Sequence, residues 1–288
     1  MSKLKKALAK ADENRGFDSR RVVSGSIKPA APTRLKPDQI EKAKSKLDIS
    51  YSKTKVQKID NNVLRNGKIF SHFHDAETID QIKALRTQIL NSLDKLHGNS
   101  LLVTSANPGE GKTFTSINLG ISIAQELHRT VLIVDCDLKD HSKKLHKQFA
   151  QDFFGLEITK GLSDYLLGNA EITEILLNPG IERLVIVPAG NTLANSAELL
   201  SSPKMAALVD DFKNRYPSDR IIIYDCSALL AHTDSLVLSR YVDGILLVVE
   251  EKRATTEQIK KTMELLKDKT LIGSVINKMR YGDTDKHR

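Results

Sequence analysis

Residues 101–114 read Leu-Leu-Val-Thr-Ser-Ala-Asn-Pro-Gly-Glu-Gly-Lys-Thr-Phe, an apolar run followed by a glycine-rich turn and the start of a helical pattern. The order of strand, glycine-rich turn and helix predicts a phosphate-binding loop over residues 105–113. Gly109 and Gly111 allow the backbone to curl, so that successive N–H groups converge on a phosphate. This loop is the strongest indication of what the chain binds.

The two residues that follow the turn strengthen this prediction. Lys112 adds a positive charge directed towards the β- and γ-phosphates of a nucleotide, and the Thr113 hydroxyl is placed to bind Mg²⁺. The full G-x-x-x-x-G-K-[ST] pattern begins with glycine, where this chain has Ala106. The strand before the turn and the helix after it favour a phosphate loop over a chance Gly-Lys-Thr in a surface turn.

Short apolar runs continue on both sides of the loop and alternate with helical segments. We predict strands at 100–104, 130–134, 184–187, 221–224, 244–249 and 271–276, and helices at 113–128, 203–215 and 255–268. Continuous Val, Ile and Leu runs are typical of parallel strands that are buried on both faces. The fold class is therefore α/β, a doubly wound and mostly parallel sheet of the P-loop NTPase type. Ligands of such sheets lie beyond the carboxyl ends of the strands, where the loop falls.

The chain before residue 75 has a different character. It shows little sustained periodicity, and its prolines lie among many Lys and Ser residues. Beyond it, apolar residues from Ile79 to Leu96 recur at three- and four-residue steps, which predicts an amphipathic helix ending near Gly98. We therefore expect a basic, largely flexible segment over 1–74 and a folded P-loop domain over 75–288.

The net charge of +8 is concentrated at the N-terminal end. Residues 1–75 hold 18 Lys and Arg against 8 Asp and Glu, whereas residues 76–288 hold 26 against 28. The folded domain therefore has no excess of basic residues for a nucleic-acid-binding face, and we expect no specific nucleic-acid partner. The basic segment leaves room for peripheral contact with anionic lipids or an acidic partner.

Several features predict a cytoplasmic location. No apolar run approaches the roughly 18 residues that cross a bilayer, and the basic N-terminus lacks the apolar core of a secretory signal. The two cysteines, Cys136 and Cys226, each follow an aspartate at the end of an apolar run. We expect them to be small buried residues in a reducing compartment rather than a disulfide.

Acidic residues follow two of the predicted strands. Asp135 and Asp137 come after the run 131–134, and Asp225 follows the run 221–224. Carboxyl ends of neighbouring parallel strands meet at one edge, so these acids are expected next to the phosphate loop. Mg²⁺ at a nucleotide site needs only one or two carboxylates. Asp225 is the natural metal ligand, while Asp135 and Asp137 divide the roles of holding metal waters and orienting an attacking hydroxyl.

These motifs resemble those of the bacterial tyrosine kinases of polysaccharide export, within the MinD/ParA-like P-loop ATPases. Residues 108–113 match the family's P-G-E-G-K-[ST], and Asp135–Lys139 resembles its D-x-D-[LM]-R. Residues 188–190 with 195–200 resemble its P-A-G … N-P-x-E-L-L stretch, in the spacing of the exosortase-associated branch, and 273–277 resembles G-x-V-x-N. The similarity extends from about residue 77 to 280.

The resemblance implies an ATP- and Mg²⁺-dependent protein-tyrosine autokinase that regulates exopolysaccharide chain length or export. It implies the catalytic residues Lys112, Asp135 and Asp137 and the metal ligands Thr113, Asp137 and Asp225. The implied nucleotide-binding residues are Asn107, Pro108, Gly109, Glu110, Gly111, Lys112, Thr113, Phe114 and Asn277, the last of them at the adenine.

The resemblance also implies partners. The helix before the loop carries Asp80-x-x-Lys83-x-x-Arg86, a conservative version of the family's E-x-x-R-x-x-R subunit-contact motif. Self-association through this helix would place a neighbour's tyrosine at the active site. A second implied partner is a separate membrane protein of the chain-length-determinant type, whose cytoplasmic end completes the active site at the inner face of the membrane.

Departures from the family pattern leave two alternative functions open. Asn107 replaces the lysine that MinD and ParA proteins extend across their dimer, which disfavours a positioning ATPase that hydrolyses ATP with water. Cys226-Ser227-Ala228 replaces the usual x-Pro-Pro, and Asp140-His141 replaces Arg-Pro. The tail holds one tyrosine, Tyr281, and lone tyrosines are more often surface residues than phosphoacceptors. These last changes favour a nucleotide-gated structural partner of the export machinery that transfers no phosphate.

Overall fold

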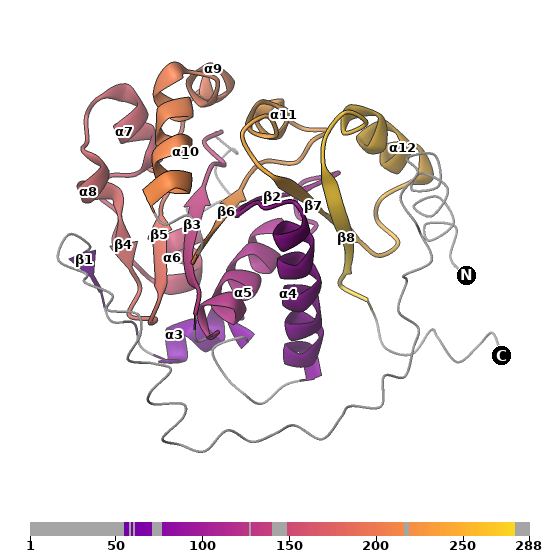
Figure 1. Cartoon of the computed structure of the whole chain (residues 1–288), viewed down its shortest axis with the longest axis horizontal. Coiled ribbons are helices and arrows are strands. Elements are labelled where there is room, and N and C mark those ends of the chain that lie inside the picture. Colours follow the sequence, from indigo (N-terminus) through magenta and orange to yellow (C-terminus); the bar gives the residue numbers. More distant parts are fainter. Residues whose placement is uncertain are drawn as a thin grey trace.

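A computed structural model describes residues 55–57, 59, 61–70, 77–126, 128–139, 149–215 and 219–279. They form an eight-stranded sheet with helices on both faces (Figure 1). The strands are β1 (Lys55–Val56), β2 (Ser100–Ser105), β3 (Thr130–Asp135), β4 (Leu177–Asn178), β5 (Leu184–Val187), β6 (Arg220–Asp225), β7 (Gly244–Glu250) and β8 (Leu271–Asn277). The helices are α3 (Asn61–Asn66), α4 (Glu77–Lys95), α5 (Lys112–Ala124), α6 (Phe149–Phe154), α7 (Leu162–Leu167), α8 (Ile172–Ile175), α9 (Ser196–Leu200), α10 (Pro203–Arg215), α11 (Asp234–Leu238) and α12 (Thr256–Leu265).

The strand order is β1-β4-β5-β3-β6-β2-β7-β8, and every pair except β4–β5 is parallel. The predicted doubly wound, mostly parallel sheet is therefore confirmed. The six predicted strands agree with β2, β3, β5, β6, β7 and β8 to within one residue at each end. Strand β2, which leads into the phosphate loop, lies between β6 and β7, so the loop emerges at the middle of the sheet.

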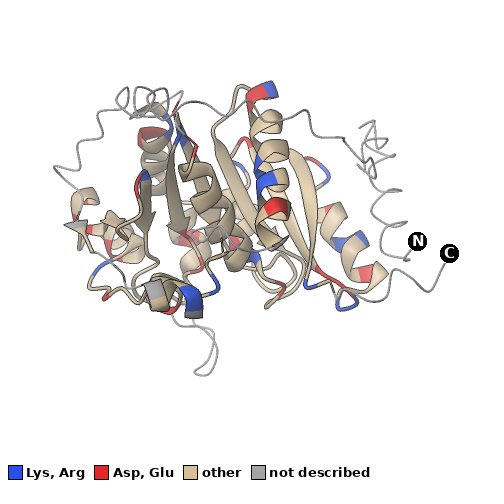
Figure 2. Cartoon of the chain, turned by 90° about the horizontal axis from the view of Figure 1, so that it is seen from below, with Lys and Arg blue, Asp and Glu red and all other residues tan. Residues whose placement is uncertain are grey.

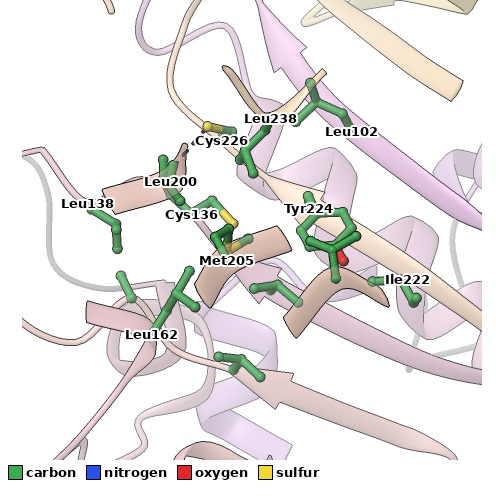
Figure 3. Packing of buried hydrophobic residues seen from close by; sticks show 14 of the residues in the cluster. Leu102, Cys136, Leu138, Leu162, Leu200, Met205, Ile222, Tyr224, Cys226 and Leu238 are labelled. Carbon is green, nitrogen blue, oxygen red and sulfur yellow. Dashed lines mark hydrogen bonds between the residues drawn. The ribbon is translucent and has the colours of Figure 1, made fainter. Parts of the chain in front are cut away.

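Two apolar layers cover the two faces of the sheet. Leu101 and Val103 of β2 pack in the layer under α4 and α5, whereas Leu102 packs in the opposite layer under α10, α11 and α12. All three side chains are fully buried. Because successive strand residues point to opposite faces, burial on both faces requires the continuous apolar runs seen in the sequence. Figure 3 shows part of the second layer, which includes Leu102, Ile222, Tyr224, Met205 and Leu238.

The described part of the packed domain begins before residue 75, in a region expected to be flexible. Leu64 and Ile69 are buried in the same layer as α4 and α5, and α3 contacts α6. Strand β1 extends the sheet by pairing with β4. These elements span two and six residues, too short to show a helical or strand period in the sequence.

Several predictions fall on parts of the chain that the structure does not describe. They concern the basic segment before residue 55, Asp140 and His141 after β3, and Tyr281 near the C-terminus. Among the residues that are described, no helix is long and apolar enough to cross a membrane.

Candidate active site

The phosphate loop connects the end of β2 at Ser105 to the start of α5 at Lys112. Gly109 and Gly111 adopt φ values of 80° and 97°, in the left-handed region where glycine carries no steric penalty. A loop of this kind directs consecutive N–H groups into one concavity. Helix α5 adds the partial positive charge of its N-terminus, so the loop has the form of an anion-binding site.

Lys112 lies inside this loop and makes an ion pair with Asp137. Its Nζ is 3.1 Å from Asp137 Oδ2, and both side chains are nearly buried. Burial lowers the pKa of Lys112, but the opposing charges of Asp137 and Asp225 more than compensate, so the pKa is raised and the ammonium stays charged. The acids that follow the strands were expected next to the phosphate loop, and Asp137 contacts the lysine of that loop directly.

Asp225 ends β6 and faces the first turn of α5. Its carboxylate accepts hydrogen bonds from the hydroxyls of Thr113 and Ser116, the latter at 3.1 Å. Burial raises the pKa of Asp225 to about 6, against the lowering effect of Lys112 and of the Thr113 hydrogen bond. Thr113 and Asp225, the two predicted metal ligands that lie furthest apart in sequence, are therefore adjacent. Ser116 joins them and was not predicted.

Asp135 occupies the position opposite Asp225 in the β3–β6 ladder. It is buried, and its Oδ1 accepts the backbone N–H of Asp137 at 3.1 Å. Burial raises the pKa of Asp135 well above its usual range, and the nearby charges of Asp225 and Asp137 raise it further. Asp135 therefore shapes the turn that carries Asp137, while Asp137 reaches Lys112.

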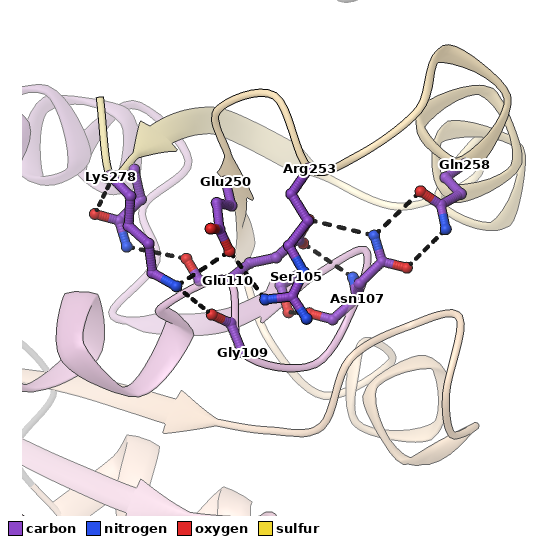
Figure 4. A network of polar contacts seen from close by, with 9 residues as sticks. Ser105, Asn107, Gly109, Glu110, Glu250, Arg253, Gln258 and Lys278 are labelled. Carbon is purple, nitrogen blue, oxygen red and sulfur yellow. Dashed lines mark hydrogen bonds and ion pairs between the residues drawn. The ribbon is translucent and has the colours of Figure 1, made fainter. Parts of the chain in front are cut away.

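The first half of the loop is held by its own side chains and by α12 (Figure 4). The buried Glu110 carboxylate accepts the backbone N–H of Asn107 at 2.9 Å. The Asn107 amide exchanges hydrogen bonds with the Gln258 amide, at 3.0 Å and 3.4 Å. Pro108, which follows Asn107 in the loop, is exposed. Asn107 and Glu110, both predicted as nucleotide-binding residues, thus make contacts that fix the shape of the loop.

Two further predicted nucleotide-binding residues also contact protein groups. The Phe114 ring packs edge-on against Phe70, with ring centroids 6.1 Å apart. Asn277, at the end of β8, donates from Nδ2 to the Glu110 carbonyl at 2.9 Å and accepts the Lys278 N–H at 2.8 Å. The structure therefore brings Asn277 to the phosphate loop itself.

The predicted subunit-contact residues on α4 separate into two environments. Asp80 and Lys83 are exposed and lie 3.6 Å apart as an i,i+3 pair. Arg86 turns inward, where its Nε is 3.0 Å from Glu126 Oε1 and its Nη1 donates to the Ser122 carbonyl at 2.9 Å. Arg86 therefore ties α4 to the C-terminal end of α5 within one chain.

The segment after β6 is ordered although it lacks the prolines of the family pattern. The N–H groups of Leu229 and Leu230 bond to the carbonyls of Ser105 and Ala106, at 2.9 Å and 3.1 Å. The Ser227 carbonyl accepts hydroxyls from Thr104 and Ser235. Hydrogen bonds to β2 and to the start of the phosphate loop thus hold this segment in place, where the family pattern has two prolines.

Both cysteines lie in the apolar layer beside this segment (Figure 3). Cys136 and Cys226 are buried free thiols, as predicted, and Cys226 Sγ lies 3.7 Å from the Cys136 carbonyl oxygen. Burial raises the pKa of each thiol. They are therefore protonated, unreactive core residues.

The donor set suits Mg²⁺ bound together with a nucleotide. Thr113 and Asp225 supply oxygen ligands that are hydrogen-bonded to each other, and Asp137, in contact with Lys112, supplies a second carboxylate. Mg²⁺ prefers oxygen donors and completes its shell with water and phosphate oxygens, so few protein ligands suffice. The described residues contain no cluster of three or more His, Cys, Asp or Glu placed to hold a metal ion.

The fold and the loop together define a P-loop nucleotide-binding domain. The sequence matches the AAA domain family over residues 100–276. It is 31% identical over 215 residues to the tyrosine-protein kinase CpsD of Streptococcus agalactiae, covering 72% of this chain and 87% of CpsD. The structure is similar to the kinase domain of the Escherichia coli tyrosine kinase ETK, with a TM-score of 0.60 and 28% identity, covering 69% of this chain and 76% of that one. The chain belongs to the bacterial tyrosine-kinase family.

Relatives of this family differ in length. The chain is 29% identical over 185 residues to the tyrosine-protein kinase Wzc of Salmonella typhimurium, which covers 64% of this chain but only 24% of Wzc. The chain thus spans about a quarter of the length of that relative. The similarity concerns the nucleotide-binding domain.

Proposed function

We propose that this domain is an ATP- and Mg²⁺-dependent protein-tyrosine kinase that regulates the length or export of an exopolysaccharide. The observation that carries the proposal is the contact of Lys112 with Asp137 beside the Thr113–Asp225 pair, at the mouth of the phosphate loop. This places a cation for the phosphates, oxygen ligands for a metal and a carboxylate within one small region. The names of the relatives specify protein tyrosine as the phosphate acceptor.

In the proposed mechanism the loop N–H groups and Lys112 bind the β- and γ-phosphates. Thr113 and Asp225 would hold Mg²⁺, which neutralises charge that develops on the phosphates during transfer. When Lys112 turns to a phosphate, Asp137 is released from the ion pair and accepts the proton of the tyrosine hydroxyl as its oxygen bonds to the γ-phosphorus. The hydroxyl oxygen and the departing ADP oxygen lie in line across that phosphorus.

The partners belong to the same proposal. Asp80 and Lys83, two exposed charged residues of α4, are proposed to contact a neighbouring copy that supplies the acceptor tyrosine. A separate membrane protein of the chain-length-determinant type is proposed to bind at the active site and hold the chain at the inner membrane face. The basic N-terminal segment would contribute at most peripheral contact with lipid.

The test is phosphate transfer from labelled ATP with Mg²⁺, with and without the cytoplasmic segment of the membrane partner. We expect phosphotyrosine on the wild-type chain and its loss in Lys112→Ala. Lys160→Ala, which removes an exposed ion pair with Glu174, is the matched control and should leave transfer unchanged. Release of free phosphate without phosphotyrosine would instead indicate a positioning ATPase. ATP binding with neither product would indicate a nucleotide-gated structural partner.

A further inference from the structure

Two side chains at the end of β8 hold two consecutive carbonyl groups of the phosphate loop (Figure 4). Lys278 Nζ donates to the Gly109 carbonyl at 2.8 Å, and Asn277 Nδ2 donates to the Glu110 carbonyl at 2.9 Å. More than 160 residues separate the partners in sequence. Strand β8 pairs with β7, the neighbour of β2, so the sheet brings these residues to the loop.

The direction of a carbonyl group fixes the direction of the next N–H group. In a planar trans peptide the C=O and N–H bonds point in opposite directions. Binding the Gly109 and Glu110 carbonyls on the β8 side therefore turns the N–H groups of Glu110 and Gly111 to the opposite side. Convergent N–H groups on one side are what a phosphate-binding nest requires.

The surrounding contacts keep Lys278 in this position. Its Nζ also lies 3.1 Å from Glu250 Oε2, and Arg253 lies 3.0 Å from the same oxygen. The hydrogen bond from Arg253 lowers the pKa of Glu250, which keeps the carboxylate ionised at neutral pH. Lys278 itself has a φ of 57°, a left-handed conformation that is unfavourable for a non-glycine residue and is retained where surrounding contacts enforce it.

The fit between Asn277 and the loop is close. A methyl group at Gly111 would collide with Asn277 Nδ2, and one at Gly109 would lie 3.1 Å from the Arg253 guanidinium. The two loop glycines thus permit both the left-handed backbone and the approach of these side chains. A residue with a side chain at 111 would push Asn277 away from the loop.

We propose that Asn277 and Lys278, held by Glu250, are positioning residues that set the loop N–H groups for the phosphates of the nucleotide. The proposal rests on the proposed role of the loop as the ATP site and adds two residues that act on it from β8. It differs from the adenine contact that the family resemblance implies for Asn277. Positioning affects every ligand that carries a polyphosphate, whereas an adenine contact affects only adenine nucleotides.

The experiment measures binding of ATP, GTP and inorganic tripolyphosphate, by competition with a fluorescent ATP analogue. The variants are Lys278→Met and Asn277→Leu, with Lys267→Met as the matched control. Lys267 is an exposed lysine paired with Glu264 and distant from the loop in sequence. We expect each of the two variants to bind all three ligands about five- to tenfold more weakly, the effect of losing one charge-assisted or partly buried hydrogen bond. Lys278→Arg should restore binding, because a guanidinium can donate to the same carbonyl and pair with Glu250.

A second measurement follows the protection of the loop N–H groups in the absence of nucleotide. Hydrogen–deuterium exchange of the peptide covering residues 109–112 should be faster in Lys278→Met and Asn277→Leu than in the wild type and in Lys267→Met, with equal unfolding temperatures for all. The proposal is overturned if Lys278→Met matches Lys267→Met in binding and exchange. It is also overturned if Asn277→Leu weakens ATP but leaves GTP and tripolyphosphate unchanged, because that pattern identifies an adenine contact. A wild-type chain that binds ATP but forms no phosphotyrosine would refute the proposed kinase and leave this test intact.

Discussion

Asp135 and Asp137 are two residues apart, yet they have different surroundings. Asp137 contacts Lys112, whereas Asp135 is buried behind the turn and accepts a backbone N–H. The pKa of Asp135 is raised by burial and then by neighbouring carboxylates, so its charged form is disfavoured and an uncharged amide fits the same site. Asp137 is therefore the better candidate for contact with the reacting groups.

Asn substitutions at these two positions should separate their roles. We expect Asp137→Asn to lower phosphotyrosine formation by about 100-fold or more, the usual effect of losing a general base. Asp135→Asn should keep ATP affinity within about threefold of wild type, because an amide oxygen still accepts the Asp137 N–H. Initial rates of transfer and titration with ATP are the measurements. Equal loss of transfer in both variants, with unchanged ATP binding, would contradict this division.

Asp243 is a structural carboxylate at the opposite end of the sheet. It accepts the N–H groups of Asn99 and Ser100, the Ser100 hydroxyl and the Lys213 ammonium, at 2.6 to 3.0 Å. Burial raises its pKa, but these hydrogen bonds, that of Lys213 first, lower the pKa overall. Asp243→Ala should therefore cost about 2 kcal/mol of unfolding free energy at pH 7, since buried donors lose their acceptor.

The pH dependence of this effect has a definite sign. A carboxylate with a depressed folded-state pKa stabilises the fold above its unfolded pKa, and this contribution is lost as pH falls through the folded pKa. The difference between wild type and Asp243→Ala should thus be constant from pH 7 to about 5 and shrink below about pH 4. Urea unfolding at several pH values measures it. A difference that grows in acid would contradict this assignment.

At the residue level, the sequence predicted the site residues that lie in the phosphate loop or directly after a strand. It missed the site residues that only tertiary packing brings to the loop. Lys112, Thr113 and Asp225 sit at strand ends or in the loop, so parallel-sheet geometry alone brings them together. Lys278 and Ser116 lie just after recognisable motifs but belong to neither, and only the sheet order and the helix phase place them at the site. Gln258 caps the start of α12 through two hydrogen bonds with Thr255, and its contact with Asn107 depends on tertiary packing.

Helix α4 provides a test of the proposed self-association. Asp80 and Lys83 are exposed, whereas Arg86 pairs with Glu126 on the same chain. Lys83→Glu should weaken assembly and change unfolding free energy by less than about 0.5 kcal/mol, as for other surface substitutions. Arg86→Ala should instead cost about 2 kcal/mol, because it removes hydrogen bonds to the end of α5.

Light scattering and urea unfolding distinguish these two effects. Lys95→Glu, on an exposed position of the same helix, is the control for charge reversal and should leave assembly unchanged. An Arg86→Ala chain that unfolds like the wild type but no longer assembles would show that Arg86, and not Lys83, makes the subunit contact.

The length of an element decided whether the sequence could predict it. Helices α4, α5, α10 and α12 have ten or more residues and show a helical period, and the six main strands are continuous apolar runs. Helices α7, α8 and α11 have four to six residues, less than two turns, so no period is visible. Strand β4 has two residues and runs antiparallel to β5, a pairing that depends on tertiary contacts.

On the scale of the whole domain, both basic and acidic residues lie along the described helices. Figure 2 shows Lys and Arg interspersed with Asp and Glu on the described helices in that view. This agrees with the near balance of acidic and basic residues over 76–288. Affinity for an acidic partner or lipid would therefore depend on the N-terminal segment or on local clusters.

Residues 55–70 contribute to the stability of the whole domain, because they complete the layer under α4 and α5. Leu64 and Ile69 are almost fully buried there, and Asn118 of α5 donates to the Lys68 carbonyl at 3.2 Å. Burial of two large apolar side chains contributes about 4 kcal/mol. A chain that begins at residue 77 should therefore melt roughly 10 °C below one that begins at residue 55.

A single substitution tests the same packing without truncation. Leu64→Ala should cost about 3 kcal/mol, the usual effect of deleting a buried leucine side chain. Val56→Ala, at a half-exposed position of β1, is the control and should cost less than about 0.5 kcal/mol. Two results would place the folded boundary at residue 75, as the composition alone suggested. They are equal melting temperatures for chains that begin at 55 and 77, and an unfolding free energy that Leu64→Ala leaves unchanged. A loss in both experiments would instead make residues 55–70 part of the folded nucleotide-binding domain, because they pack against α5, the helix that carries Lys112 and Thr113.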